Sequence, residues 1–149
     1  MTKIPNFFGP FPPLKDINKE SYMSSIVPND EALSALASNP DEGIIVMLNP
    51  LKFKCEEGAE AYDRYATSGS KMLEAGAACT IYADKAVELL VGDKTWDVIV
   101  PVEYPSSKVF LEMVNSPEYR KAHVDREQGL ERTVLYATSP MGAWARFSE

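Results

Sequence analysis

Metal-binding and nucleophilic side chains are scarce in this sequence. It has a single histidine, His123, and two cysteines, Cys55 and Cys79, which lie in different predicted elements and are expected to be free thiols. No HExxH or CxxC motif is present, so a first-row metal site would need scattered carboxylates. No glycine-rich phosphate loop precedes a predicted helix, and no GxSxG motif occurs. We therefore expect neither a metal nor another cofactor.

Positive charge and long apolar runs are also lacking. Fifteen basic residues stand against twenty-two acidic ones, for a net charge of −7, and no basic run occurs. This balance argues against nucleic acid and anionic membranes as partners. No stretch approaches the roughly 18 apolar residues of a membrane span, and the N-terminal MTKIPNFFGPFPPLK lacks the apolar core of a signal peptide. The expected location is the cytoplasm.

Composition predicts three parts of the chain. Residues 1–27 hold four prolines and three phenylalanines, a mixture that excludes a long helix and favours extended chain. This arm is either a loosely ordered terminus or a segment whose phenylalanines pack on a neighbouring surface, such as a second subunit. A folded domain is expected over residues 28–139, followed by a tail, 140–149, whose apolar residues recur every third position as in a helical turn.

Apolar periodicity and capping residues predict the helices. Asn29 or Asp30 can cap a short helix, and the clearest helix covers residues 57–76, with Gly76 as a left-handed C-cap. Residues 109–114 have helical spacing. Ser116-Pro117-Glu118 then supplies an N-cap, a proline in the first position and an acidic first turn, which together predict a separate helix.

Clusters of β-branched and aromatic residues predict the strands. The predicted strands are residues 44–49, continued after Pro50 by 51–54; residues 78–83 and 86–91, with Asp84-Lys85 as a turn or bulge; residues 97–104; and residues 133–137. The order strand, helix, strand, strand, helix, strand is typical of a ferredoxin-like α+β sandwich, in which helices cover one face of an antiparallel sheet. Since the strands are too apolar for their other face to meet water, we expect a homodimer with a pocket between sheet and helices.

Several short motifs follow one another in order along this domain. They are Val46-Met47-Leu48-Asn49-Pro50-Leu51-Lys52-Phe53, Gly58-Ala59-Glu60-Ala61-Tyr62-Asp63-Arg64-Tyr65, Trp96-Asp97, Val102-Glu103-Tyr104-Pro105-Ser106 and Ser116-Pro117-Glu118-Tyr119. With these motifs the sequence resembles the DUF1330-type proteins of the dimeric α+β barrel superfamily, over roughly residues 28–139. The resemblance implies a ferredoxin-like fold and a dimeric barrel, whereas most members of that family have no established activity.

Three positions depart from the family pattern. Pro50 replaces a residue that is usually apolar, and Pro101 falls inside a central strand, where it removes a ladder hydrogen bond unless a bulge absorbs it. The family often has a histidine next to the arginine of its short helix. Here Arg126 matches that arginine, but His123 is displaced along the chain.

Polar residues at the strand ends and on the helices form the candidate site. Asn49 ends the first strand and Glu103 ends the third, and these strands are neighbours in a ferredoxin-like sheet, so the two side chains are expected to lie close together. A desolvated Glu103 would act as acid or base, Asn49 or Arg126 would stabilise an enolate or carboxylate, and His123 would transfer a proton. The expected substrate-binding residues are Tyr62, Tyr65, Tyr104, Tyr119 and Trp96.

Structural interpretations of the same residues remain open. Tyr119, His123 and Arg126 are spaced to share one side of their helix. Even so, Glu103 and Arg126 are equally well explained as a structural ion pair. His123 is better explained as a solvated helix residue, and Trp96 as a core residue, than as parts of a site.

Two functions from different classes follow. The first is a cofactor-independent enzyme of the lyase, isomerase or monooxygenase-like type, acting on a small, largely apolar organic molecule, aromatic ones included. The second is a non-catalytic protein that binds such a molecule in the same pocket. The enzyme hypothesis rests on analogy with superfamily members. A haem- or metal-dependent barrel is less well supported, since His123 is the only imidazole available.

Overall fold

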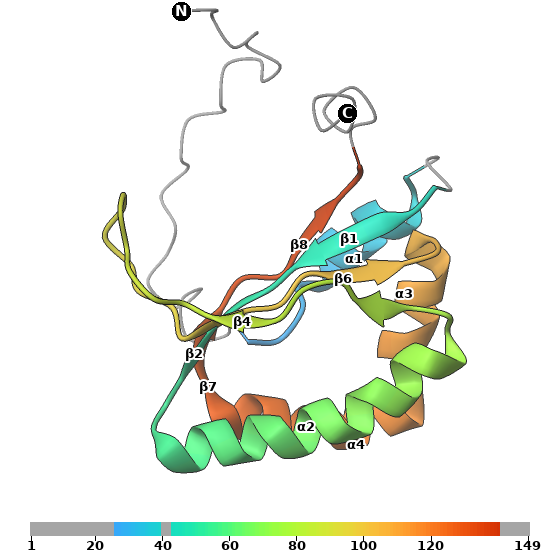
Figure 1. Cartoon of the computed structure of the whole chain (residues 1–149). Coiled ribbons are helices and arrows are strands. Elements are labelled where there is room, and N and C mark those ends of the chain that lie inside the picture. The colour runs from blue at the N-terminus through green and yellow to red at the C-terminus, as the bar shows by residue number, and fades with distance from the viewer. Residues whose placement is uncertain (1–25, 40–42, 141–149) are drawn as a thin grey trace, which may run out of the picture.

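The computed structural model describes residues 26–39 and 43–140, which form an α+β fold (Figure 1). Helices α2 and α4 lie side by side beneath one face of an antiparallel sheet, and α1 packs on α3 at its edge. The helices are α1 (Asp30–Ala37), α2 (Glu56–Ala75), α3 (Ser107–Val114) and α4 (Pro117–Gly129). The strands are β1 (Ile45–Leu48), β2 (Pro50–Phe53), β3 (Cys79–Thr80), β4 (Asp84–Lys85), β5 (Val98–Ile99), β6 (Val102–Tyr104), β7 (Leu130–Thr133) and β8 (Tyr136–Thr138).

Each long strand of the sheet is interrupted once. One half has the order β3-β6-β1-β8 and the other the order β4-β5-β2-β7, so the halves continue each other. Backbone hydrogen bonds keep neighbouring strands joined at the interruption. The Val100 amide donates to the Asn49 carbonyl (3.0 Å), and the Asp97 amide donates to the Leu51 carbonyl (2.8 Å). The resulting order of the four long strands is that of a ferredoxin-like fold, which confirms the predicted fold class.

Proline positions explain two of these interruptions. Pro50 follows Asn49 at the break between β1 and β2, and Pro101 lies between β5 and β6. A proline cannot donate to the ladder, so a central strand tolerates it only at such a break. Ile81 nevertheless donates its amide to the Pro101 carbonyl, at 3.1 Å, which keeps the sheet joined there.

The predicted helix starts are confirmed by their caps. The Asn29 side chain accepts from the Glu31 amide at 2.8 Å, and the Ser116 hydroxyl accepts from the Tyr119 amide at 3.2 Å with Pro117 in the first turn. These bonds satisfy backbone donors that the first turn leaves free. The Ser116 cap therefore separates α4 from α3 and sets the direction in which α4 crosses the sheet.

Two glycines allow α2 and α4 to touch through their backbones. A Cβ atom on Gly58 would lie 2.7 Å from the Gly129 carbonyl oxygen, and one on Gly129 would lie 2.5 Å from the Gly58 carbonyl oxygen. Gly129 also accepts a hydrogen bond from the Lys54 amide at 3.0 Å. Farther along the same pair of helices, Arg64 Nε lies 3.2 Å from Asp125 Oδ1. The two helices are thus held closely together.

Three local predictions were wrong. Asp84-Lys85, predicted as a turn or a bulge, is the regularly paired strand β4, which lies beside β5. Residues 86–91 form no strand: after the Ala86 amide bonds to the Asp97 carbonyl (2.9 Å), the chain leaves the sheet as a hairpin that extends beyond its end in Figure 1. Apolar residues favour a strand only where a partner strand is available, and β5 begins only at Val98. The left-handed residue after α2 is Ala77 (φ 54°) and not Gly76, whose Cβ position would be 3.1 Å from the Val109 side chain.

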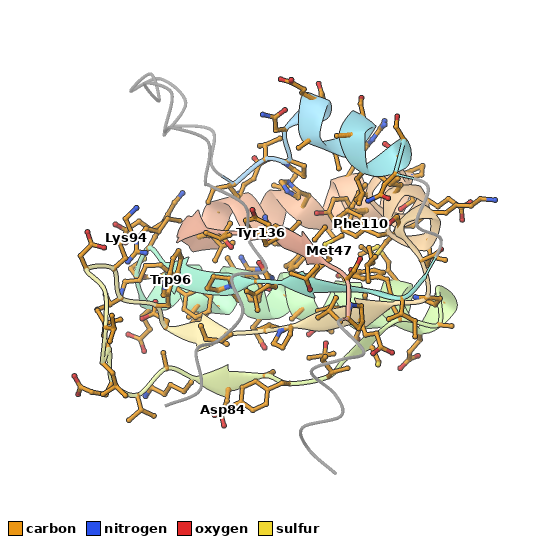
Figure 2. All side chains as sticks on the ribbon, turned by 90° about the horizontal axis from the view of Figure 1, so that it is seen from above. Met47, Asp84, Lys94, Trp96, Phe110 and Tyr136 are labelled. Carbon is orange, nitrogen blue, oxygen red and sulfur yellow. The ribbon has the colours of Figure 1, made fainter. Side chains whose placement is uncertain are left out.

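The two faces of the sheet differ in what covers them. Ile45, Met47 and Tyr104 point toward the helices and pack with Phe110 in the core. The alternate residues point to the other face, where Leu48 is 43% exposed. Figure 2 looks onto this outer face, with Tyr136 near its middle.

The predicted N-terminal arm lies outside the described residues except for its last two positions, and the predicted helical turn of the tail lies wholly outside them.

Candidate functional site

A cavity of about 410 Å³ lies between the inner face of the sheet and the helices. Its walls are mostly apolar, with Met47, Leu51 and Val100 from the sheet and Met72 from α2 among the lining residues. Six of the nine predicted site residues also line it. These are Asn49, Tyr62, Tyr65, Tyr104, Tyr119 and Arg126. The cavity is therefore apolar along its walls and carries amide, phenol and guanidinium groups in addition.

Asn49 is positioned by the break between β1 and β2. It is buried, and its Oδ1 atom lies 3.4 Å from Arg126 Nη2 and 3.1 Å from the hydroxyl of Thr133. The Thr133 hydroxyl lies closer still, at 2.8 Å, to the Pro50 carbonyl oxygen, so its single proton is shared between the two acceptors. The Asn49 side chain also acts on Tyr62, whose pKa it lowers. A buried amide with these partners has a fixed orientation toward the cavity.

Arg126 is the positive charge of the cavity. It comes from α4, where it shares a face with Tyr119, and only 3% of its surface is exposed. Its Nη1 atom donates to the Ile26 carbonyl at 2.9 Å. Both bonds of the guanidinium thus go to neutral oxygens, those of Ile26 and Asn49.

Tyr62, Tyr104 and Tyr119 keep their hydroxyl protons at physiological pH. Burial raises the pKa of Tyr62 to about 12, with a further contribution from Tyr65, while Arg126 and Asn49 act in the opposite direction. Burial likewise raises the pKa of Tyr104 and of Tyr119. The ring centroids of Tyr62 and Tyr65 are 5.3 Å apart, and those of Tyr65 and Tyr119 are 6.4 Å apart. These contacts form an aromatic wall.

Glu103 does not lie in this cavity, so the prediction that Asn49 and Glu103 lie close together on one site was wrong. Side chains alternate along a strand, and Val102 and Tyr104 point into the cavity. Glu103, between them, therefore points to the outer face, where it pairs across the strands with Val46 and Cys79. No ion pair joins it to Arg126 among the described residues, so that structural alternative is wrong as well.

His123 and Trp96 also lie outside the cavity lining. His123 is buried beneath a separate, shallower hollow, and its Nδ1 atom is 3.0 Å from Glu127 Oε1. Burial and the Arg126 charge lower the pKa of His123, while Glu127 opposes this shift. The interpretation of His123 as a solvated helix residue is therefore wrong. Trp96 is half-buried, and its ring centroid lies 4.3 Å from the Cζ atom of Arg132. Figure 2 shows Trp96 toward the left end of the molecule.

One carboxylate of the lining was missed from the sequence. Asp63 lines the cavity from α2 and is itself exposed to solvent. It belongs to a stripe of lining residues spaced by three and four, in the order Ala59, Tyr62, Asp63, Ala66, Gly69, Ser70 and Leu73. The helical spacing around Tyr62 was the signal that could have found Asp63.

Within residues 26–39 and 43–140, no three His, Cys, Asp or Glu side chains lie together as a metal site would need. Over the same residues, no helix has the length and apolar character needed to cross a membrane.

The strand order, the helices on one face and the cavity between them define a ferredoxin-like α+β protein. Within that class the chain belongs to the DUF1330 family, since the model of this family, described as a domain of unknown function, matches residues 56–139. This confirms the resemblance seen in the sequence. A comparison with curated proteins found no match.

Solved structures agree with this assignment. The crystal structure of RPA0582, a protein of unknown function from Rhodopseudomonas palustris, is 30% identical and covers 78% of this chain and 96% of its own, with a TM-score of 0.73. A dimeric protein of unknown function and ferredoxin-like fold from Bacteroides fragilis is 10% identical (66% and 98% covered, TM-score 0.51). A hydroxynitrile lyase from Passiflora edulis is 12% identical (68% and 98% covered, TM-score 0.53). The last two share the fold alone.

Proposed function

We propose that this protein binds a small, largely apolar organic molecule in the cavity between the sheet and the helices. The observation that carries the proposal is the cavity itself, about 410 Å³ with apolar walls and a few converging polar groups. Pockets of this size and character are the usual sites for small molecules. The buried bonds around Asn49 support it further, because they hold the polar groups in place before a ligand arrives.

Filling the cavity is expected to abolish binding without unfolding the protein. Gly69 lines the cavity from α2, and a Cβ atom there would meet no atom within 4 Å. In Gly69→Phe we expect the ring to enter the cavity and exclude the ligand. The protein should stay folded, because glycine is an unfavourable residue within a helix. Small aromatic compounds should raise the melting temperature of the wild type by mass action, and this shift should vanish in Gly69→Phe.

The matched control is Ser68→Phe, which adds the same ring one residue earlier, at an exposed position outside the cavity lining. It should keep the ligand-induced shift. A compound that stabilises wild type and Gly69→Phe equally binds elsewhere and contradicts the proposal.

A second candidate function, a cofactor-independent lyase or isomerase, is favoured by the donors that converge in the cavity. Asn49, Tyr62 and Arg126 are suited to stabilise an enolate oxygen, because they provide fixed donors and a positive charge away from bulk water. In such a reaction a base removes a proton from the carbon next to a carbonyl group, and the carbonyl oxygen takes up the negative charge. Asp63, which lines the cavity, is the carboxylate that we propose accepts that proton, in place of Glu103.

Hydrogen exchange separates catalysis from binding alone. If Asp63 removes a carbon-bound proton, then a bound carbonyl compound in D₂O exchanges that proton for deuterium, which ¹H NMR detects. We expect Asp63→Asn to slow this exchange about a hundredfold or more. Glu60→Gln, on the same helix but outside the cavity lining, should leave it unchanged. A bound compound that never exchanges would show that the cavity only binds.

We propose further that two copies of the chain associate through the outer face of the sheet. Leu48 and Tyr136 are cross-strand neighbours there, and Tyr136 is 65% exposed. The hairpin of residues 86–97 extends away from α2 and α4 in Figure 1, and its Leu90 is 88% exposed. Apolar area of this kind is usually covered by a partner, and a second copy would cover both surfaces by two-fold symmetry. The Bacteroides fragilis protein of the same fold is described as dimeric.

A further inference from the structure

The Arg126 guanidinium is a buried positive charge without a carboxylate partner among the described residues. The acidic residues on either side of it in α4 are bound elsewhere: Asp125 pairs with Arg64 at 3.2 Å, and Glu127 pairs with His123 at 3.0 Å. Burying a charge is costly unless an opposite charge or several hydrogen bonds compensate it. The two neutral oxygens that Arg126 binds leave several of its N–H donors uncommitted.

The place of this charge indicates what would compensate it. Arg126 lines the cavity with Tyr62, whose raised pKa keeps its hydroxyl protonated and able to donate, whereas the Tyr104 hydroxyl already donates to Met113 Sδ at 3.9 Å. Asp63, the carboxylate on the lining, lies on the exposed side of α2 and forms no ion pair with Arg126. The cavity thus combines one cation and neutral donors with apolar walls.

We infer that the ligand of this cavity is an aromatic or similarly apolar monocarboxylate, whose carboxylate binds Arg126 and Tyr62 while its apolar part packs against the wall of Tyr65, Tyr119 and Leu51. The inference rests on the proposed function, since it names the class of molecule that the cavity binds. A guanidinium matches a carboxylate in geometry and forms strong, charge-assisted hydrogen bonds with it. Inorganic phosphate fits less well, because the apolar walls offer nothing to a fully hydrated dianion.

The N-terminal segment is the competing source of a carboxylate. Residues 1–25 contain two acidic residues, Asp16 and Glu20, and the segment continues into Ile26, whose carbonyl binds Arg126. If one of these side chains is the partner of Arg126, the cavity has no need of a charged ligand. The experiment therefore has to distinguish a ligand carboxylate from these two.

The test compares carboxylates with their own amides on the full-length protein. Isothermal titration calorimetry with phenylacetate, 4-hydroxyphenylacetate and 2-naphthoate, each beside its primary amide, measures the contribution of the charge at nearly constant shape. We expect the carboxylates to bind roughly tenfold or more tightly than the amides. Arg126→Gln should remove this preference, Arg126→Lys should keep part of it, and Gly69→Phe should abolish binding of both members of a pair.

The wild-type comparison stays informative even if Arg126→Gln fails to fold. Equal affinity for carboxylate and amide, lost in Gly69→Phe, would overturn the anionic ligand while leaving the cavity as a binding site. No binding of either member would count against the proposed function itself. A carboxylate preference that appears only in Asp16→Asn/Glu20→Gln would identify the N-terminal segment as the natural partner of Arg126 and overturn the inference.

Discussion

Gly129→Ala is expected to lower the free energy of unfolding by about 1–3 kcal/mol. The new methyl group would lie 2.5 Å from the Gly58 carbonyl oxygen and 3.0 Å from the Tyr62 amide nitrogen, which are both backbone atoms of α2. Neither can move aside as the end of a flexible side chain does, so α2 and α4 must separate. Because Tyr62 and Arg126 line the cavity from these two helices, the separation also distorts the proposed site. Urea denaturation followed by circular dichroism measures the change.

Gly69→Ala is the matched control for this substitution. It makes the same chemical change at a helical glycine, but its methyl group meets no atom within 4 Å. Because alanine favours helix more than glycine, we expect an increase of about 0.5–1 kcal/mol. If Gly129→Ala were as stable as the wild type, the close contact of α2 and α4 would not exist.

Leu48→Asp is expected to convert the protein from dimer to monomer. Leu48 lies on the outer face of the central strand β1, opposite Tyr136 of β8. In a two-fold interface the new carboxylate appears twice and is buried without a partner, which costs several kcal/mol. We therefore expect the dissociation constant to rise by about a hundredfold or more. Sedimentation equilibrium of the wild type should give twice the mass of one chain, and that of Leu48→Asp the mass of one chain.

Val124→Asp is the control, because it places the same charge on an exposed apolar residue of α4, away from the outer face. It should stay dimeric. A wild-type protein that sediments as a single chain at high concentration would refute the proposed interface, as would a Leu48→Asp variant that remains a dimer.

Local signals in the sequence were enough to predict the parts of the site that depend on one element. The Ser116 cap and Pro117 predicted where α4 begins, and the spacing from there placed Tyr119 and Arg126 on one face. Pro50 after an apolar strand marked the break between β1 and β2, and the alternation of side chains from Met47 to Leu51 places Asn49 on the cavity side. These features depend on the chain within a few residues, so the sequence records them directly.

Features that depend on pairing between distant segments were predicted less well. The break at Pro101 leaves alternation intact in β6, so Glu103 faces outward while Tyr104 faces the cavity, and the choice of face cannot be read from a polar residue at a strand end. The apolar residues 86–91 suggested a strand because their composition does not reveal that no neighbouring strand reaches them. His123 was expected beside Arg126, yet three residues along α4 rotate its ring out of the cavity lining.

A crystal structure of the full chain with bound 4-hydroxyphenylacetate tests the central claim most directly. We predict that the ring lies in the cavity against Tyr65 and Leu51, with the carboxylate within hydrogen-bond distance of the Arg126 guanidinium. A different result at saturating ligand would contradict this mode of binding. In that result the cavity holds only side chains of the protein, and Arg126 is paired with an aspartate or glutamate of the same chain.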